Sequence, residues 1–148
     1  MRKLAIVVSM FVSLSAFAHD EGHGPKLTDT GRQGGIVAPV VDAKDASKGA
    51  GAQVLFKSEL VRSEDGSIRL FLYDKGMNPV DLGKFGKTAQ GTLASKKNKK
   101  WSKDSFALNQ EDGSFVGKAP KASSKPFNIE VRVKEGSKEL LTAFENLD

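Results

Sequence analysis

The chain has 148 residues, with 23 Lys and Arg against 18 Asp and Glu, no Cys, two His and one Trp. This length suits one domain with a single core. The lack of Cys excludes a disulfide scaffold, a thiolate zinc site, an iron–sulfur cluster, a cysteine nucleophile and a cysteine-linked lipid anchor. Both His residues lie near the N-terminus, so the remainder of the chain lacks the commonest general base. We expect a protein that is not an enzyme.

The N-terminal 18 residues have the three parts of a secretory signal peptide. The chain begins MRK, continues with an apolar run over residues 4–17 and reaches a small-x-small cleavage site, AFA, at residues 16–18. The run is shorter than the roughly 20 residues of a transmembrane helix. We therefore predict a periplasmic or secreted protein that begins at His19 and has no transmembrane segment after cleavage. An uncleaved signal anchor is the alternative.

Residues 19–33 form a polar, Gly-containing segment, which we interpret as a flexible leader. Cleavage before His19 would leave a free α-amine beside its imidazole, which gives two nitrogen donors for a metal ion. His23 would add a third nitrogen, and Asp20 and Glu21 would add oxygens. Such a set suits Cu(II), then Ni(II) or Zn(II). A polar leader without metal is the alternative, since ordering a flexible segment costs entropy.

From residue 34 to the end of the chain the apolar pattern has the period of strands. The clearest signal is the alternation over Phe127–Val133, and Asp-Gly pairs at residues 65–66 and 112–113 mark turns. Residues 42–51 are polar and small, as in a loop. The predicted strand segments are 36–41, 54–61, 68–73, 80–82, 87–94, 106–116 (around the second Asp-Gly turn), 127–133 and 140–144.

Seven or eight short strands at this spacing predict an all-β fold. We expect a single domain over residues 34–148, either an antiparallel immunoglobulin-like β-sandwich or a small barrel. The Cys…Trp…Cys pattern of antibody domains is absent, so the likeness concerns architecture only. We expect a monomer.

Five lysines surround the single tryptophan in a predicted hairpin region. Such a cluster could bind an anionic lipid surface, or a nucleic-acid backbone with one stacked base. Alternatively, the lysines are solvated and block edge-to-edge strand pairing, while the tryptophan caps the core. Cleavage of the signal would lower the net charge from +5 to +3, which with export disfavours a nucleic-acid partner. The residues are Lys96, Lys97, Lys99, Lys100, Trp101 and Lys103.

No catalytic motif stands out in the chain. The carboxylates of Asp65, Asp74, Asp112 and Glu135 lie in predicted turns, where Asp commonly bonds the local backbone. The sequence contains no H-E-x-x-H, no G-x-S-x-G, no P-loop and no dinucleotide fingerprint.

The order of motifs resembles that of small exported bacterial proteins associated with heavy-metal efflux systems. The likeness covers most of the mature chain: a polar His/Asp/Glu/Gly leader, Gly-Gly-x-Val at residues 34–37, Glu-Leu-Val at 59–61, Gly-x-Ile-Arg-Leu-x-Leu-Tyr-Asp at 66–74, Asn-Pro-Val-Asp at 78–81 and Ala-x-Gly-x-Leu at 89–93. The resemblance implies an all-β periplasmic domain that binds or hands over a metal, with efflux components or other envelope proteins as partners.

One position departs from that resemblance, which implies a His two residues before the Glu of Glu-Leu-Val. Here that place holds Lys57, whose protonated ammonium cannot ligate a metal. A looser similarity links the chain to copper-resistance β-sandwich proteins with an N-terminal His. We therefore expect weak Cu(II) or Zn(II) binding by the leader. The alternative is a metal-independent interaction module that uses Arg69, Phe71 and Tyr73 with the basic hairpin.

Overall fold

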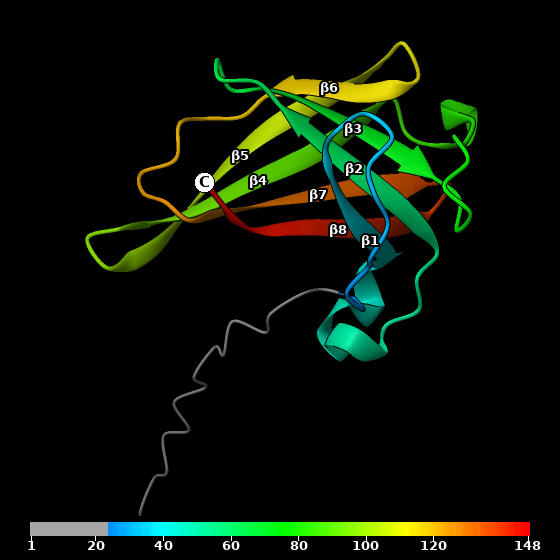
Figure 1. Ribbon diagram of the computed structural model, residues 1–148, viewed down its shortest axis with the longest axis horizontal. Coiled ribbons are helices and arrows are strands. Elements are labelled where there is room, and N and C mark those ends of the chain that lie inside the picture. Colours follow the sequence, from blue (N-terminus) through cyan, green and yellow to red (C-terminus); the bar gives the residue numbers. More distant parts are fainter. Residues whose placement is uncertain (1–23) are drawn as a thin grey trace, which may run out of the picture.

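The computed structural model describes residues 24–148, which form eight strands and two short 3₁₀ segments (Figure 1). The predicted signal peptide, residues 1–18, lies outside the described residues. In chain order the elements are β1 (Ile36–Asp42), η1 (Ala43–Gly51), β2 (Phe56–Arg62), β3 (Ser67–Tyr73), η2 (Leu82–Lys84), β4 (Thr88–Lys97), β5 (Lys100–Glu111), β6 (Ser114–Lys118), β7 (Phe127–Glu135) and β8 (Lys138–Leu147).

All eight strands pair antiparallel in one closed barrel, in the order β1-β2-β3-β6-β5-β4-β7-β8. The barrel closes where Val40, Val41 and Asp42 of β1 pair with Thr142, Leu141 and Leu140 of β8. The all-β prediction is confirmed, and of its two architectures the small barrel is the one observed. An immunoglobulin-like sandwich is not confirmed, since a single sheet closes on itself here.

Alternating side chains fill the barrel. On β7 the four residues at alternate positions, from Phe127 to Val133, are all buried, as the sequence pattern predicted. They pack with inward residues of the other strands, such as Leu70, Leu108 and Phe115, into one apolar core. The interior also holds a polar pair, because Ser58 and Thr142 are hydrogen-bonded 2.6 Å apart between their hydroxyl oxygens.

One end of the barrel is closed by η2. The side-chain amide of Gln110 donates to the carbonyl oxygens of Leu82, Phe85 and Gly86 and so holds this segment against β5. The predicted strand at residues 80–82 was wrong: Asp81 caps η2 by accepting from the Gly83 amide, so the chain turns helical at Leu82. The opposite end, from which the β4–β5 hairpin projects, is called the hairpin end below (Figure 1).

The first 3₁₀ segment, η1, packs on the outside of the barrel where β1 meets β8. Val41 and Leu141 point outward there and are buried with Ala52, with Ala43 and Ala46 of η1 packed against them. Within residues 24–148 there is no helix of the length and hydropathy needed to cross a bilayer.

Candidate functional site

The basic hairpin extends beyond the closed part of the barrel. Strands β4 and β5 pair along ten positions, up to Lys97 opposite Lys100. By contrast, β7 pairs with β4 only as far as Ala94, and β6 pairs with β5 only from Leu108 onward. The last residues of β4 and the first of β5 therefore form a two-stranded ribbon that projects from the molecule (Figure 1).

The ribbon ends in a two-residue turn in which Asn98 and Lys99 both have positive φ, of 51° and 64°. This is the φ signature of a type I′ hairpin turn, for which Asn-Gly is the preferred pair. Asn98 suits its position, but Lys99 occupies the place where glycine would cost least. Just behind the turn, Lys97 and Lys100 face each other, a like-charge pair that opposes strand pairing. The tip thus carries its positive charge at a cost in stability.

Trp101 lies one position behind this pair, opposite Lys96 on the outer face of the ribbon. Its side chain is 37% exposed, and the Lys96 ammonium lies 5.6 Å from the ring centroid. The expectation that Trp101 caps the core was wrong, because the ribbon carries the ring beyond the barrel end. Because side chains alternate along a strand, Lys96, Trp101 and Lys103 lie on one face of the ribbon and Lys97 and Lys100 on the other, so the lysines flank the indole on both sides of the projecting tip.

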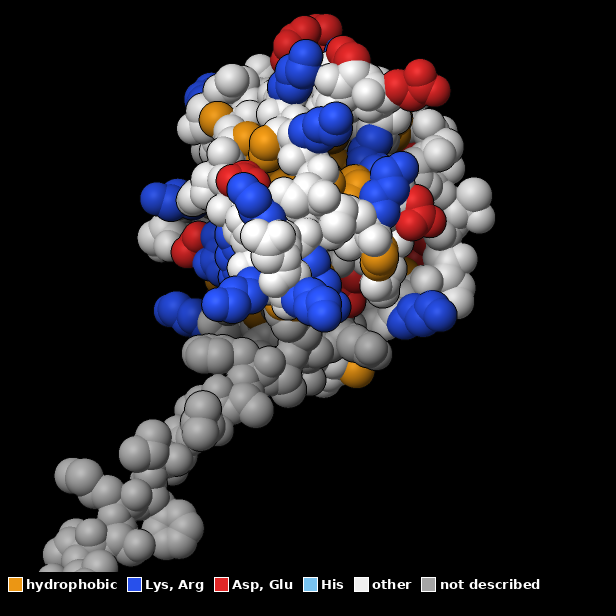
Figure 2. Space-filling model, turned by 90° about the vertical axis from the view of Figure 1, so that its left-hand side faces the viewer, with side chains coloured by type: hydrophobic (Ala, Val, Ile, Leu, Met, Phe, Trp, Pro, Cys, Tyr) orange, Lys and Arg blue, Asp and Glu red, His pale blue; other side chains and the backbone are white. Residues whose placement is uncertain are grey.

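The connector between β6 and β7, residues 119–126, braces the base of the ribbon and adds further charge. The Ser123 amide donates to Ser95 Oγ at 3.0 Å, and the Lys96 amide donates to Ser124 Oγ at 3.1 Å. The connector carries exposed Lys121 and Lys125. Residues 82–103 and 113–129 contain no Asp or Glu. Figure 2 views this side of the molecule, on which Lys and Arg side chains predominate over scattered acidic ones.

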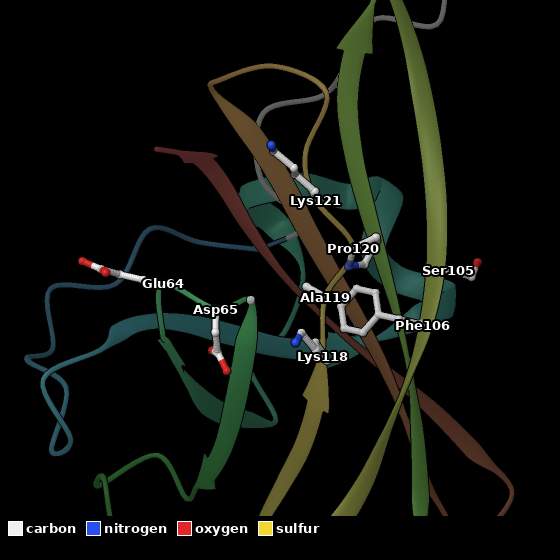
Figure 3. Close-up of a pocket in the computed structure, with 9 residues that line it drawn as sticks. Glu64, Asp65, Ser105, Phe106, Lys118, Ala119, Pro120 and Lys121 are labelled. Atoms are coloured by element: carbon white, nitrogen blue, oxygen red, sulfur yellow. The ribbon is translucent and has the colours of Figure 1, made fainter.

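A groove of about 840 Å³ opens at the hairpin end, between the turn at residues 64–66 and the start of the connector (Figure 3). The Phe106 ring points toward Ala119 and Pro120, while Glu64, Ser105 and Lys121 point away. Backbone and hydroxyl hydrogen bonds from Ser67, with the nearby Lys118 charge, hold the pKa of Asp65 below its ordinary value. Its carboxylate is thus already bonded within its own turn.

A second unusual feature is a carboxylate buried on the outer face of β2. Glu59 is 0% exposed because residues 29–35 fold back over it. Its Oε1 accepts from the amides of Gln33 and Gly35, at 2.8 and 2.7 Å. Its Oε2 accepts from the Arg32 amide at 2.9 Å and the Tyr73 hydroxyl at 2.8 Å. We call Glu59, Tyr73 and residues 31–35 the carboxylate clasp.

Hydrogen bonding keeps this carboxylate charged. Burial alone would raise the pKa of Glu59, but the hydrogen bonds from Gly35, Tyr73, Gln33 and Arg32 outweigh it and bring the pKa below its ordinary value. Burial and the neighbouring carboxylate raise the pKa of Tyr73 to about 12. Both groups are therefore fixed in one protonation state near neutrality, which suits a structural anchor.

Glycine makes the close approach of the clasp possible. A Cβ placed on Gly31 would collide with Glu59 Oε1, and one on Gly35 would collide with the Leu60 carbonyl oxygen. The backbone can reach the carboxylate only without these side chains. The Gly-Gly-x-Val and Glu-Leu-Val motifs are thus two halves of one contact.

Two further contacts hold the segment that precedes β1. Lys57 Nζ pairs with Asp29 at 2.8 Å, and the Arg32 guanidinium donates to the Met77 carbonyl oxygen at 3.0 Å. Gly24 lies against Pro39, since a Cβ there would come within 2.6 Å of its ring. We expected a flexible leader over residues 19–33. The part that the structure describes, residues 24–33, instead lies along the barrel.

The four predicted metal ligands, His19, Asp20, Glu21 and His23, lie outside the described residues. Within residues 24–148, no group of three or more His, Asp or Glu residues could hold a metal ion. Lys57, which stands where the resemblance implies a His, is engaged by Asp29.

The predicted interaction surface on β3 is largely covered. Tyr73 is 2% exposed and donates to Glu59, while Arg69 and Phe71 are half-buried. The alternation of β3 correctly placed these three side chains outside the barrel. However, residues 29–35 cover the end of β3 that carries Tyr73. Sequence reasoning missed Glu59 because an acidic residue at an outward strand position is typical of a solvent-exposed face.

Comparisons of the chain with protein-family models, with curated proteins and with solved structures gave no match. Within the residues that the structure describes, the basic hairpin is the surface that gathers the most charge of one sign.

Proposed function

We propose that this chain is a non-enzymatic binding protein, in which the barrel serves as a rigid mount and the basic hairpin binds an anionic partner. The supporting observation is the projecting ribbon, which gathers five lysines and Trp101 with no acidic residue between positions 82 and 103. Export as a periplasmic or secreted protein belongs to this proposal. The partner is then an anionic surface of the cell envelope.

Edge protection alone is a weaker explanation of the lysines. Lysine side chains at an exposed edge do block strand addition. Here five lysines occur within eight residues, two of them directly opposite each other and one at a left-handed turn position. These placements disfavour the hairpin itself, so a role outside the fold accounts for them better.

Charge reversal at the tip tests this proposal. The variant carries Lys97→Glu, Lys99→Glu and Lys100→Glu, and the matched control carries Lys44→Glu, Lys75→Glu and Lys138→Glu, three exposed lysines elsewhere. Retention on an immobilised sulfated polysaccharide is measured as a function of salt. We expect the tip variant to bind at least about tenfold more weakly than the control, although both have the same net charge. Equal loss in the two variants would show that only overall charge matters and would refute the proposal.

Metal binding is a second candidate function, favoured by the contacts that hold the segment before β1 against the barrel. A metal ion bound by His19, Asp20, Glu21 and His23 would have to order the leader. On a long free leader this ordering would cost much conformational entropy. The contacts of Asp29, Arg32 and Gly24 with the barrel shorten the segment that a metal ion would have to order. In this proposal the protein is an accessory of heavy-metal handling, with efflux components as partners, and Cu(II) or Zn(II) as the bound ion.

Calorimetric titration with Cu(II) and Zn(II) tests this second candidate. The chain beginning at His19 is compared with one beginning at Pro25, which keeps the clasp. We expect heat of binding only from the longer chain. Indistinguishable isotherms would eliminate the leader as a metal site.

A further inference from the structure

We propose that the anionic partner is a lipid bilayer, on which the hairpin docks tip first with Trp101 at the interface between headgroups and acyl chains. This inference rests on the proposed function and names its partner. Indole rings favour this interface because they combine an apolar body with a polar N–H. Lysines close to an anionic leaflet add electrostatic attraction.

The shape of the ribbon suits contact with a flat membrane surface better than contact with a single-stranded nucleic acid. Proteins that hold single-stranded nucleic acid use a basic groove that follows the backbone, with aromatic rings open for base stacking. The ribbon is instead a projection, braced at its base by Ser123 and Ser124. One face of the Trp101 ring is already covered by the Lys96 ammonium, 5.6 Å from its centroid. A base could not stack on that face without displacing the cation, whereas insertion between headgroups leaves it in place.

The hairpin lysines are spaced so that an anionic membrane can attract them all at once. A strand advances about 3.3 Å per residue, so Lys96 and Trp101 lie roughly 3 Å behind the Lys97–Lys100 pair, and Lys103 about 10 Å behind it. Electrostatic attraction to a surface extends about 8–10 Å at physiological ionic strength. With the tip in contact, the hairpin lysines therefore lie within or near that range. Most of the barrel lies beyond it.

The fluorescence of Trp101 can report membrane binding, because Trp101 is the single tryptophan of the chain. Its fluorescence is recorded with vesicles of neutral phospholipid and with vesicles that contain about one third anionic phospholipid. We expect a blue shift and reduced acrylamide quenching with anionic vesicles only. The tip variant (Lys97→Glu, Lys99→Glu, Lys100→Glu) should partition about 100-fold more weakly, whereas the Lys44, Lys75 and Lys138 control keeps the shift. Trp101→Ala, followed by vesicle co-sedimentation, should bind several-fold more weakly than the unaltered chain.

Three results would overturn the proposal in whole or in part. Vesicle binding without a change in Trp101 emission would show adsorption by charge alone and would overturn the placement of Trp101 at the interface, and the proposed function would stand. Quenching by single-stranded oligonucleotide but not by vesicles would make nucleic acid the partner. Equal behaviour of tip variant and control on vesicles and on the polysaccharide would refute the inference and the proposed function together.

Discussion

The carboxylate clasp and the basic hairpin use charged side chains on strands in opposite ways. Glu59 is fully buried, and four hydrogen bonds from within the fold satisfy its carboxylate. The hairpin lysines are exposed, and none of the ion pairs between described residues involves them. The difference separates a charge that stabilises the molecule from charges that are available to something outside it.

The largest effect should follow from neutralising the clasp. Glu59→Gln keeps the shape of the side chain but places an amide group among donors, so backbone amides lose a charged acceptor. We expect the free energy of unfolding to fall by roughly 3 kcal/mol, measured by urea denaturation. Glu64→Gln, on an exposed turn, is the control and should change it by less than about 0.5 kcal/mol. A similar small change in both variants would mean that the clasp contributes nothing.

Lowering the pH should remove the stabilising contribution of the Glu59 carboxylate without a mutation. The pKa of Glu59 in the fold lies below its ordinary value of 4.5, so its stabilising contribution is present above pH 4.5 and is lost as the pH falls through the folded-state value. Unfolding free energies of the unaltered chain and of Glu59→Gln should therefore converge as the solution is acidified below pH 4.5. Parallel curves over this range would contradict the assignment.

A smaller loss of stability should follow when the backbone of residues 31–35 can no longer approach Glu59 closely. Gly31→Ala places a methyl group against Glu59 Oε1, and the clasp must shift to admit it. We expect a destabilisation of about 1–3 kcal/mol. Gly51→Ala is the matched control, because a Cβ there meets nothing within 4 Å. If thermal denaturation finds the two substitutions equivalent, residues 31–35 do not pack on Glu59 in solution.

The smallest effect on stability is expected at the hairpin tip, with the opposite sign. Lys99→Gly relieves a positive-φ position and should raise the unfolding free energy by about 0.5–1 kcal/mol. The same change removes a charge from the binding surface and should weaken retention on the polysaccharide. Improved stability with unchanged retention would show that Lys99 is not part of that surface.

The features of the fold that depend on a few neighbouring residues could be predicted from the sequence. The alternation of Phe127–Val133 marked β7, and the lysines around Trp101 marked a hairpin, because these signals lie within a few residues. Closure of the barrel depends on pairing between β1 and β8, about a hundred residues apart, which no local pattern encodes. The burial of Glu59 was missed for the same reason: it depends on residues 29–35 folding back across β2.

We place the binding site at the hairpin end, and backbone amide NMR can locate it residue by residue. A soluble sulfated oligosaccharide is titrated into the labelled protein, and shifts are followed for each residue. If the hairpin end binds the oligosaccharide, the largest changes should fall on residues 95–103, with smaller ones at Lys121 and Lys125, and the amides bonded to Glu59 should not move. Changes centred on the groove at residues 64–66, or spread evenly over exposed lysines, would contradict this placement.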